Sequence, residues 1–252
     1  MTALHKTLDG SREQYASYHF RRFYDYSPRE YERWKRKYTF YFKDLLPSDR
    51  SAKILDLGCG GGRFLYFLKS LGYSHIAGVD SEEMQLRALR AAVGCQAYQS
   101  DVLEFLASTT EQYDLLSCHH VIEHLSREDS AELLDLIHRS LVPGGRLILS
   151  TPNALRPWAG WHLFGDLSHD HLFTPSSLKE SLEVAGFQAV QLKSEGAVPS
   201  DPLAAMRWLL WKVWREPYLK LTFALDNGFG CLAGSRLIVS EGIIASACRP
   251  LE

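Results

Sequence analysis

The chain has 252 residues, of which 46% are hydrophobic and 23% charged, and its net charge is −2. This length and composition favour one globular α/β domain with an insertion, and the near-neutral charge argues against nucleic acid as a partner. We expect neither a secretory leader nor a transmembrane span, because no apolar run reaches about 18 residues. Five scattered cysteines without a CxxC pair predict reduced thiols in a cytoplasmic protein.

The first predicted element is an amphipathic helix over residues 29–46. Its aromatic and apolar residues recur at spacings of three and four, as a helix laid on a core requires. Pro47 ends it, and its opposite face is rich in lysine and arginine.

Residues 52–80 predict a strand, a glycine-rich turn, a helix and a second strand. Gly58 and Gly60 allow a tight turn and the close approach of a ligand to the backbone. The helix that follows points its free N–H groups at that ligand. Asp80 ends the second strand, where a carboxylate can accept both hydroxyls of a ribose. This half-unit is therefore suited to a nucleoside with an anionic group beside it.

The spacing of the glycines indicates which family of nucleoside-binding proteins the turn resembles. The dinucleotide pattern G-x-G-x-x-G fails, because Arg63 stands at its third glycine. The match is instead D-x-G-x-G-x-G, formed by Asp56, Gly58, Gly60 and Gly62. It resembles the first motif of the class I S-adenosylmethionine-dependent methyltransferases, and the resemblance covers about residues 50–195. The implied cofactor is S-adenosylmethionine. The predicted cofactor-binding residues are Asp56, Gly58, Cys59, Gly60, Asp80, Ser81, Asp101, Val102, His119 and Arg36.

Two of these roles follow the resemblance and have a plain alternative. In the resembled family an acid after the third strand bonds the adenine amino group, and Asp101 holds that position. It can equally be the N-cap of the next helix. On the N-terminal helix, Arg36 or Lys37 is implied to reach the cofactor carboxylate, whereas the alternative is a solvated cationic face.

The rest of the chain continues to alternate between predicted strands and predicted helices. Ser81 is expected to cap a second helix. Further strands are predicted at 95–99, 113–118, 146–150, 187–192 and 231–240, and further helices at 129–141 and 178–185, with 241–252 as a tail. The L-x-P-G-G turn before residue 146 is frequent in the resembled family.

These elements predict a doubly wound, mostly parallel seven-stranded sheet with helices on both faces. Three parts are expected: an N-terminal helical cap (1–47), a methyltransferase core (48–195 and 231–242) and an aromatic helical insertion (196–230). The insertion is open to three roles: a substrate lid, a homodimer surface, or a peripheral membrane contact through 203–223.

Histidines gather where a base would be needed. The segment from His169 through Phe173 to Pro175 resembles the H-x-x-x-F-x-P segment of methyltransferases of ubiquinone biosynthesis and bacterial glycan decoration. Histidine suits general-base work near neutral pH. We predict His169 and His124 as catalytic residues; the alternative for each is a structural histidine bonded to a loop carbonyl.

A metal site is an alternative role for the histidines that follow residue 118. The run His120-x-x-Glu123-His124 matches the zinc-peptidase pattern H-x-x-E-H, but it closes a strand rather than lying on a long helix. The prediction is no metal, with a divalent ion on Glu123, His120 and His124 as the alternative. Related ubiquinone-pathway enzymes carry glutamate at the position of His120.

The predicted reaction is methylation of a hydroxyl on a small-molecule, sugar or lipid-linked glycan acceptor. The alternatives are N-methylation of a small molecule, an NAD-dependent oxidoreductase, and a non-catalytic partner that only binds the cofactor.

Overall fold

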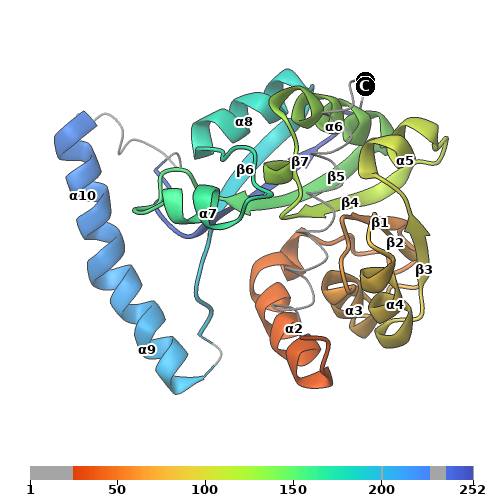
Figure 1. The fold of residues 1–252 in the computed structure, drawn as a ribbon, viewed down its shortest axis with the longest axis horizontal. Coiled ribbons are helices and arrows are strands. Elements are labelled where there is room, and N and C mark those ends of the chain that lie inside the picture. The colour runs from red at the N-terminus through yellow and green to blue at the C-terminus, as the bar shows by residue number, and fades with distance from the viewer. Residues whose placement is uncertain (1–24, 200, 228–236, 252) are drawn as a thin grey trace.

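The fold is known from a computed structural model, which describes residues 25–199, 201–227 and 237–251. Most of the N-terminal segment ahead of the first predicted helix lies outside these residues. So does the first part of the predicted strand 231–240. The described part contains the predicted core except for residues 231–236 (Figure 1).

Seven strands and their connecting helices follow the expected alternation. The strands are β1 (Ile54–Leu57), β2 (Ile76–Asp80), β3 (Gln96–Gln99), β4 (Tyr113–His119), β5 (Leu141–Pro152), β6 (Gln188–Glu195) and β7 (Gly242–Cys248). The α-helices are α2 (Pro28–Phe42), α3 (Arg63–Ser70), α4 (Glu83–Ala92), α5 (Val102–Ser108), α6 (Arg127–Ser140), α7 (Gly160–Gly165), α8 (Pro175–Val184), α9 (Pro202–Leu210) and α10 (Glu216–Asn227). Single turns are η1 (Lys43–Leu45), η2 (Ile122–His124) and the π-turn η3 (Trp211–Arg215).

The strands form one sheet in the order β3-β2-β1-β4-β5-β7-β6. The pairs from β3 to β5 are parallel, while β7 runs antiparallel to both of its neighbours. The chain leaves β1 toward one edge and returns at β4 on the other side. A crevice therefore opens between the carboxyl ends of β1 and β4, where open α/β sheets bind their ligands. The predicted fold class is confirmed.

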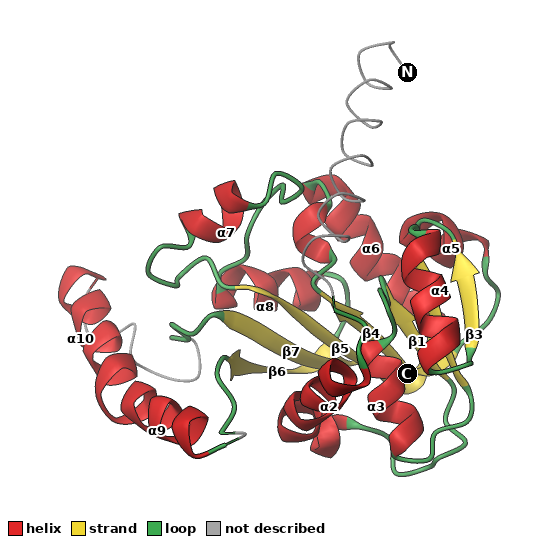
Figure 2. Cartoon of the chain, turned by 60° about the horizontal axis from the view of Figure 1, so that its bottom comes forward, coloured by secondary structure: helices red, strands yellow, loops and turns green. Residues whose placement is uncertain are grey.

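Helices cover both faces of the sheet (Figures 1 and 2). On one face, α6 and α8 bury residues such as Leu133, Ile137 and Leu178 in one apolar cluster. On the other, α2, α3 and α4 bury Phe42, Phe64 and their neighbours in a second cluster. Because both faces are covered, all four residues of β1 are buried.

The predicted position of the last strand is wrong, and with it the core boundary at 242. The strand is β7, Gly242–Cys248, which lies in the segment predicted as a tail. The apolar residues 237–239 are buried, yet they form a loop rather than a strand. Asn153 Nδ2 donates to the carbonyls of Ile238 (2.7 Å) and Ser240 (3.1 Å), which replaces part of the missing ladder. Burial therefore explains their composition.

The insertion before β7 is helical, as predicted. α9, η3 and α10 join end to end, and the resulting rod stands away from the sheet and its covering helices (Figures 1 and 2). Within the described ranges, no helix is long and apolar enough to cross a membrane.

Candidate active site

The glycine turn after β1 is shaped by three positive φ angles, at Gly58, Gly60 and Gly62. A Cβ on Gly58 would lie 2.3 Å from Val121 Cγ2, so this glycine is needed for packing. At Gly60, φ is +50° and the nearest atom to such a Cβ is Gln85 Oε1 at 3.7 Å. The backbone at Gly60 therefore has no close neighbour where a side chain would stand, and Gly60 lines the crevice.

Asp80 is held against this turn by two backbone donors. Its Oδ2 accepts from the Gly60 N–H at 2.8 Å and its Oδ1 from the Glu82 N–H at 2.9 Å. Burial raises the pKa of Asp80, and the two hydrogen bonds oppose that rise. The N-cap of α4 is Glu82, without a side-chain bond, so the predicted cap by Ser81 is wrong. Ser81 instead lines the crevice.

Asp56 lies deeper, with only 2% of its surface exposed. Ser117 Oγ donates to its Oδ1 at 2.7 Å. Burial raises the pKa of Asp56 to about 7, although the bond from Ser117 acts in the other direction. A cation bound beside this carboxyl would favour its ionised form.

Asp101 is the N-cap of α5, accepting from the N–H groups of Leu103 (2.8 Å) and Glu104 (3.3 Å). Asp101 therefore has its alternative role, that of a helix N-cap. Asp101 also lines the crevice together with Val102, so the capping bonds leave it facing the ligand space.

These groups line one cavity of about 1060 Å³. A site for one small molecule typically has about 300–1,000 Å³, so this cavity has room for an acceptor beside a cofactor. Every predicted cofactor residue except Arg36 lines it. Arg36 is exposed and lies outside the cavity lining, which corrects its prediction. The next residue, Lys37, lines the cavity in its place.

Lys37 belongs to an ion-pair network that the sequence did not reveal. Its Nζ lies 2.8 Å from Oε1 of Glu195, the last residue of β6. Glu195 is buried, and its Oε2 lacks a hydrogen-bond partner within the described part of the chain. The sequence feature that could have indicated Glu195 is an acidic residue at the end of a strand, as at Asp80. This pair joins α2 to the carboxyl edge of the sheet.

His119 ends β4 and is packed among the rings of Tyr38, Phe42 and Phe64. Its Nδ1 lies 3.0 Å from Ser150 Oγ, and its buried Nε2 has no partner among the described residues. Burial lowers the pKa of His119 to about 3. The ring is therefore neutral at physiological pH and lines the cavity as a polar but uncharged surface.

His120 adopts the left-handed backbone region, with φ of 56°. Strain of this kind costs about 1–3 kcal/mol and collects at functional sites. Its Nδ1 lies 3.1 Å from Glu123 Oε1, and its Nε2 lies 3.8 Å from Glu195 Oε2. Partial removal from water acts to lower the pKa of His120, whose side chain is 45% exposed, but Glu123 and Glu195 raise it above its usual value. The two carboxylates therefore favour a cationic ring.

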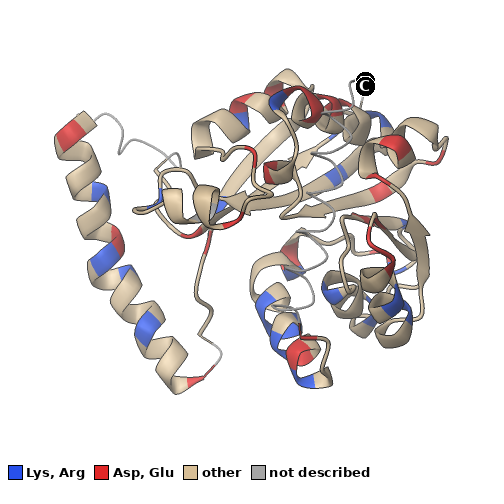
Figure 3. Ribbon diagram, in the orientation of Figure 1, with Lys and Arg blue, Asp and Glu red and all other residues tan. Residues whose placement is uncertain are grey.

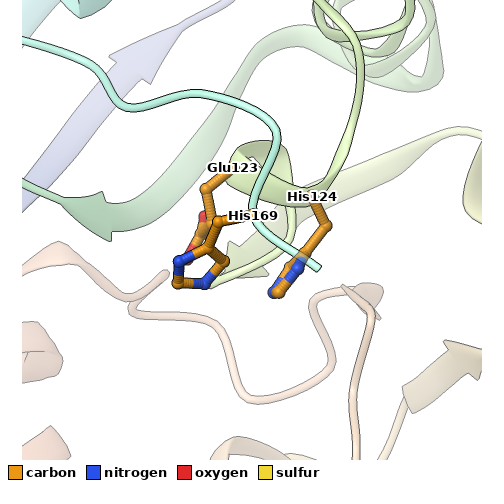
Figure 4. Close-up of side chains that lie close together, drawn as sticks. All are labelled: Glu123, His124 and His169. Atoms are coloured by element: carbon orange, nitrogen blue, oxygen red, sulfur yellow. The ribbon is translucent and has the colours of Figure 1, made fainter. Parts of the chain in front are cut away.

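His124 and His169 lie side by side beside buried Glu123 (Figure 4). Their ring centroids are 4.7 Å apart, and one potential ligand atom from each of the three residues lies within 4.8 Å of the others. His124 Nδ1 lies 3.2 Å from the Ser168 carbonyl oxygen and must donate to it, which leaves Nε2 as an acceptor. Burial lowers the pKa of His124, although Glu123 opposes it. Among the described residues, the group that meets this spacing contains His169, whereas the alternative metal site weighed from the sequence contained His120.

The network continues behind these rings. Glu123 Oε2 accepts from Thr151 Oγ1 at 3.0 Å, so both of its oxygens are occupied by the protein. Burial acts to raise the pKa of Glu123, but His120 holds it below its usual value. The end of the cavity at Glu123 therefore has a fixed negative charge, and His120, His124 and His169 lie near it.

Comparisons with known proteins agree with this geometry. A profile of the family described as "Methyltransferase domain" matches residues 22–192. The ubiquinone biosynthesis O-methyltransferase of Aeromonas salmonicida is 35% identical over 106 residues, which are 40% of this chain and 43% of that protein. Its counterpart in Idiomarina loihiensis is 28% identical over 156 residues, or 56% of this chain and 63% of that protein. The chain thus spans about half the length of these curated relatives.

Solved structures share the fold. A SAM-dependent methyltransferase from Archaeoglobus fulgidus superposes with a TM-score of 0.62 at 21% identity, covering 86% of this chain and 94% of that one. Phosphoethanolamine N-methyltransferase 2 of Haemonchus contortus, solved with S-adenosyl-L-methionine, has a TM-score of 0.56 at 16% identity, covering 82% and 51%. With the family profile, the sheet order and the glycine turn in agreement, this chain belongs to the class I S-adenosylmethionine-dependent methyltransferases.

Proposed function

We propose that this methyltransferase transfers the methyl group to a hydroxyl of a small organic acceptor, with His124 taking the proton. The observation that carries the proposal is the cluster of His124, His169 and buried Glu123 at one end of the cavity. The partly matched ubiquinone biosynthesis O-methyltransferases supply the acceptor chemistry. A sugar or lipid-linked glycan hydroxyl belongs to the same proposal.

We assign the cofactor to the glycine turn. We assign its ribose hydroxyls to Asp80, its adenine to the edge formed by Asp101 and Val102, and its methionine carboxylate to Lys37. The positively charged groups of the bound cofactor, its sulfonium and its amino group, then lie near Asp56. This placement is supported by the shared cavity lining and by the bare backbone at Gly60.

The chemistry needs positioning and one proton acceptor. The acceptor oxygen forms a bond to the methyl carbon, the bond from that carbon to the sulfonium sulfur breaks, and the hydroxyl proton passes to His124 Nε2. S-adenosylhomocysteine leaves. Correct alignment contributes about 7–11 kcal/mol to lowering the barrier, and a placed base contributes about 10²–10⁴ in rate. Neutral His124 suits the second task, because its lowered pKa keeps it unprotonated at pH 7.

The groups around His124 set its pH response. Glu123 and Asp166 favour its protonation, whereas burial and His169 oppose it. Since its pKa in the folded protein lies below 6.5, activity is expected to rise with pH below that value and then to level off.

The test uses methyl-labelled S-adenosylmethionine with a panel of phenols, catechols and sugars, matched by amines. Labelled ethers are expected from the hydroxyl compounds. His124→Gln should lower kcat by about 10²-fold or more while cofactor affinity stays unchanged. His171→Gln is the matched control, because His171 also contacts a loop carbonyl, that of Leu125 at 3.1 Å, but lies outside the cavity lining. Labelled amines alone, or equal kcat in the two variants, would contradict the proposal.

A further inference from the structure

The rod formed by α9, η3 and α10, hereafter the arm (residues 202–227), has an outer face that none of the described residues covers. At about 1.5 Å per residue the arm is about 39 Å long. It stands clear of the sheet in both views (Figures 1 and 2). Helices in proteins gain most of their stability from packing an apolar face. An arm of this length therefore implies a surface on which that face is buried.

The arm carries a continuous apolar stripe. Large side chains recur along it at helical spacings, and each is about half exposed or more. Among them are Leu203, Met206, Leu210, Val213, Trp214 and Leu221, with exposed fractions between 48% and 74%. Recurrence at three and four places them on one side of the helix.

A second apolar patch adjoins the arm. It is formed by residues in and next to α7, namely Trp158, Trp161, Phe164 and Leu167, which are 74–79% exposed. Arg215 Cζ of the arm lies 5.8 Å from the Trp158 ring centroid, which fixes the patch beside the arm. Contiguous exposed patches of this kind mark interaction sites for proteins or membranes.

The charge of the arm decides between these two partners. Lysines and arginines are spread along its length (Figure 3). Its four cations, Arg207, Lys212, Arg215 and Lys220, stand against Glu216 and Asp226, a net charge of +2 in a chain whose total is −2. Glu216 is already paired with Lys212 (2.8 Å) and Lys220 (2.9 Å).

Two arms packed on each other would bring like charges together, whereas an anionic lipid surface complements them. A tryptophan-bearing apolar stripe flanked by cations is the composition of helices that lie in the membrane interface. We propose that the arm and the α7 patch form a docking surface for an anionic lipid bilayer, on which the arm lies flat.

The proposal has a consequence for the cavity. The arm leaves the core through residues 195–198 and the chain re-enters it near Glu241 and Gly242, and both connections line the cavity. Docking would therefore hold the cavity beside the membrane surface. The inference does not depend on which acceptor is methylated.

The test is cosedimentation of the full chain with vesicles. Binding is expected to vesicles of equal parts phosphatidylcholine and phosphatidylglycerol. It should be weaker with phosphatidylcholine alone and should fall as salt rises, because surface charges are screened. Tryptophan fluorescence should shift to the blue when the mixed vesicles are added. Failure to bind the mixed vesicles at low salt would overturn the proposal.

Matched variants locate the surface. Val213→Glu removes an apolar contact from the stripe, and its vesicle affinity should fall about tenfold or more. Val184→Glu makes the same change at a residue of α8 that is 89% exposed and remote from the arm, and it should bind vesicles as the unaltered chain does. Calorimetry with S-adenosylmethionine checks that both variants remain folded. Equal vesicle binding by the two variants would overturn the proposal. The proposal would also be overturned if the unaltered chain does not bind vesicles but forms a dimer, and if Val213→Glu dissociates that dimer.

Discussion

Gly60→Ala is expected to separate ligand binding from folding. The nearest atoms to the added Cβ are Oε1 (3.7 Å) and Cδ (4.0 Å) of Gln85, so it causes no clash in the protein itself. Because Gly60 lines the cavity, we expect the added methyl group to crowd the space assigned to the cofactor. Forcing a methyl group into a close contact costs about 1–3 kcal/mol, which corresponds to a loss of affinity of about 5- to 150-fold.

Gly72→Ala provides the control. Gly72 has φ of +91°, open space around its Cβ position, and a place after α3 outside the cavity lining. Both variants put alanine in the left-handed region, at about 1 kcal/mol, so both melting temperatures should fall by about 2–4 °C. Calorimetric titration with S-adenosylmethionine should show weak binding for Gly60→Ala and normal binding for Gly72→Ala. Equal affinities would refute the assignment of the cofactor to this turn.

Two further predictions concern protons and metals. Because Asp56 has a pKa of about 7 and the cofactor brings cations beside it, binding at pH 7 should release a fraction of a proton. The binding enthalpy should therefore depend on the ionisation enthalpy of the buffer, and Asp56→Asn should abolish that dependence; a buffer-independent enthalpy in the unaltered chain argues against it. Activity should persist in EDTA if His124 is a free base; loss in EDTA with recovery in Mg²⁺ would instead indicate a metal centre at Glu123, His124 and His169.

The gathering of Gly58, Gly60 and Asp80 at one edge of the sheet could be predicted because each of these features is local in sequence. Gly58 and Gly60 need φ values that side chains disfavour, and Asp80 ends a strand that must lie beside them. Parallel pairing then brings the ends of β1, β2 and β4 to one edge.

Features set by distant contacts were harder to predict. Arg36 and Lys37 are neighbours on α2, and the pattern of apolar residues does not show which one faces the cavity. Glu195 decides this by pairing with Lys37, and it lies on β6, more than a hundred residues away. Likewise, β7 has small residues such as Ala245 and Ala247, so its composition alone does not distinguish it from a tail. Burial between β5 and β6 selects those residues.

The most direct test of the account is a crystal structure of the protein with S-adenosylhomocysteine. We predict that the nucleoside lies over the carboxyl ends of β1 and β4, with both ribose hydroxyls within hydrogen-bond distance of the Asp80 carboxylate. We also predict that the space beside the sulfur opens toward His124. A nucleoside bound at any other edge of the sheet, or a ribose that makes no contact with Asp80, would contradict the account.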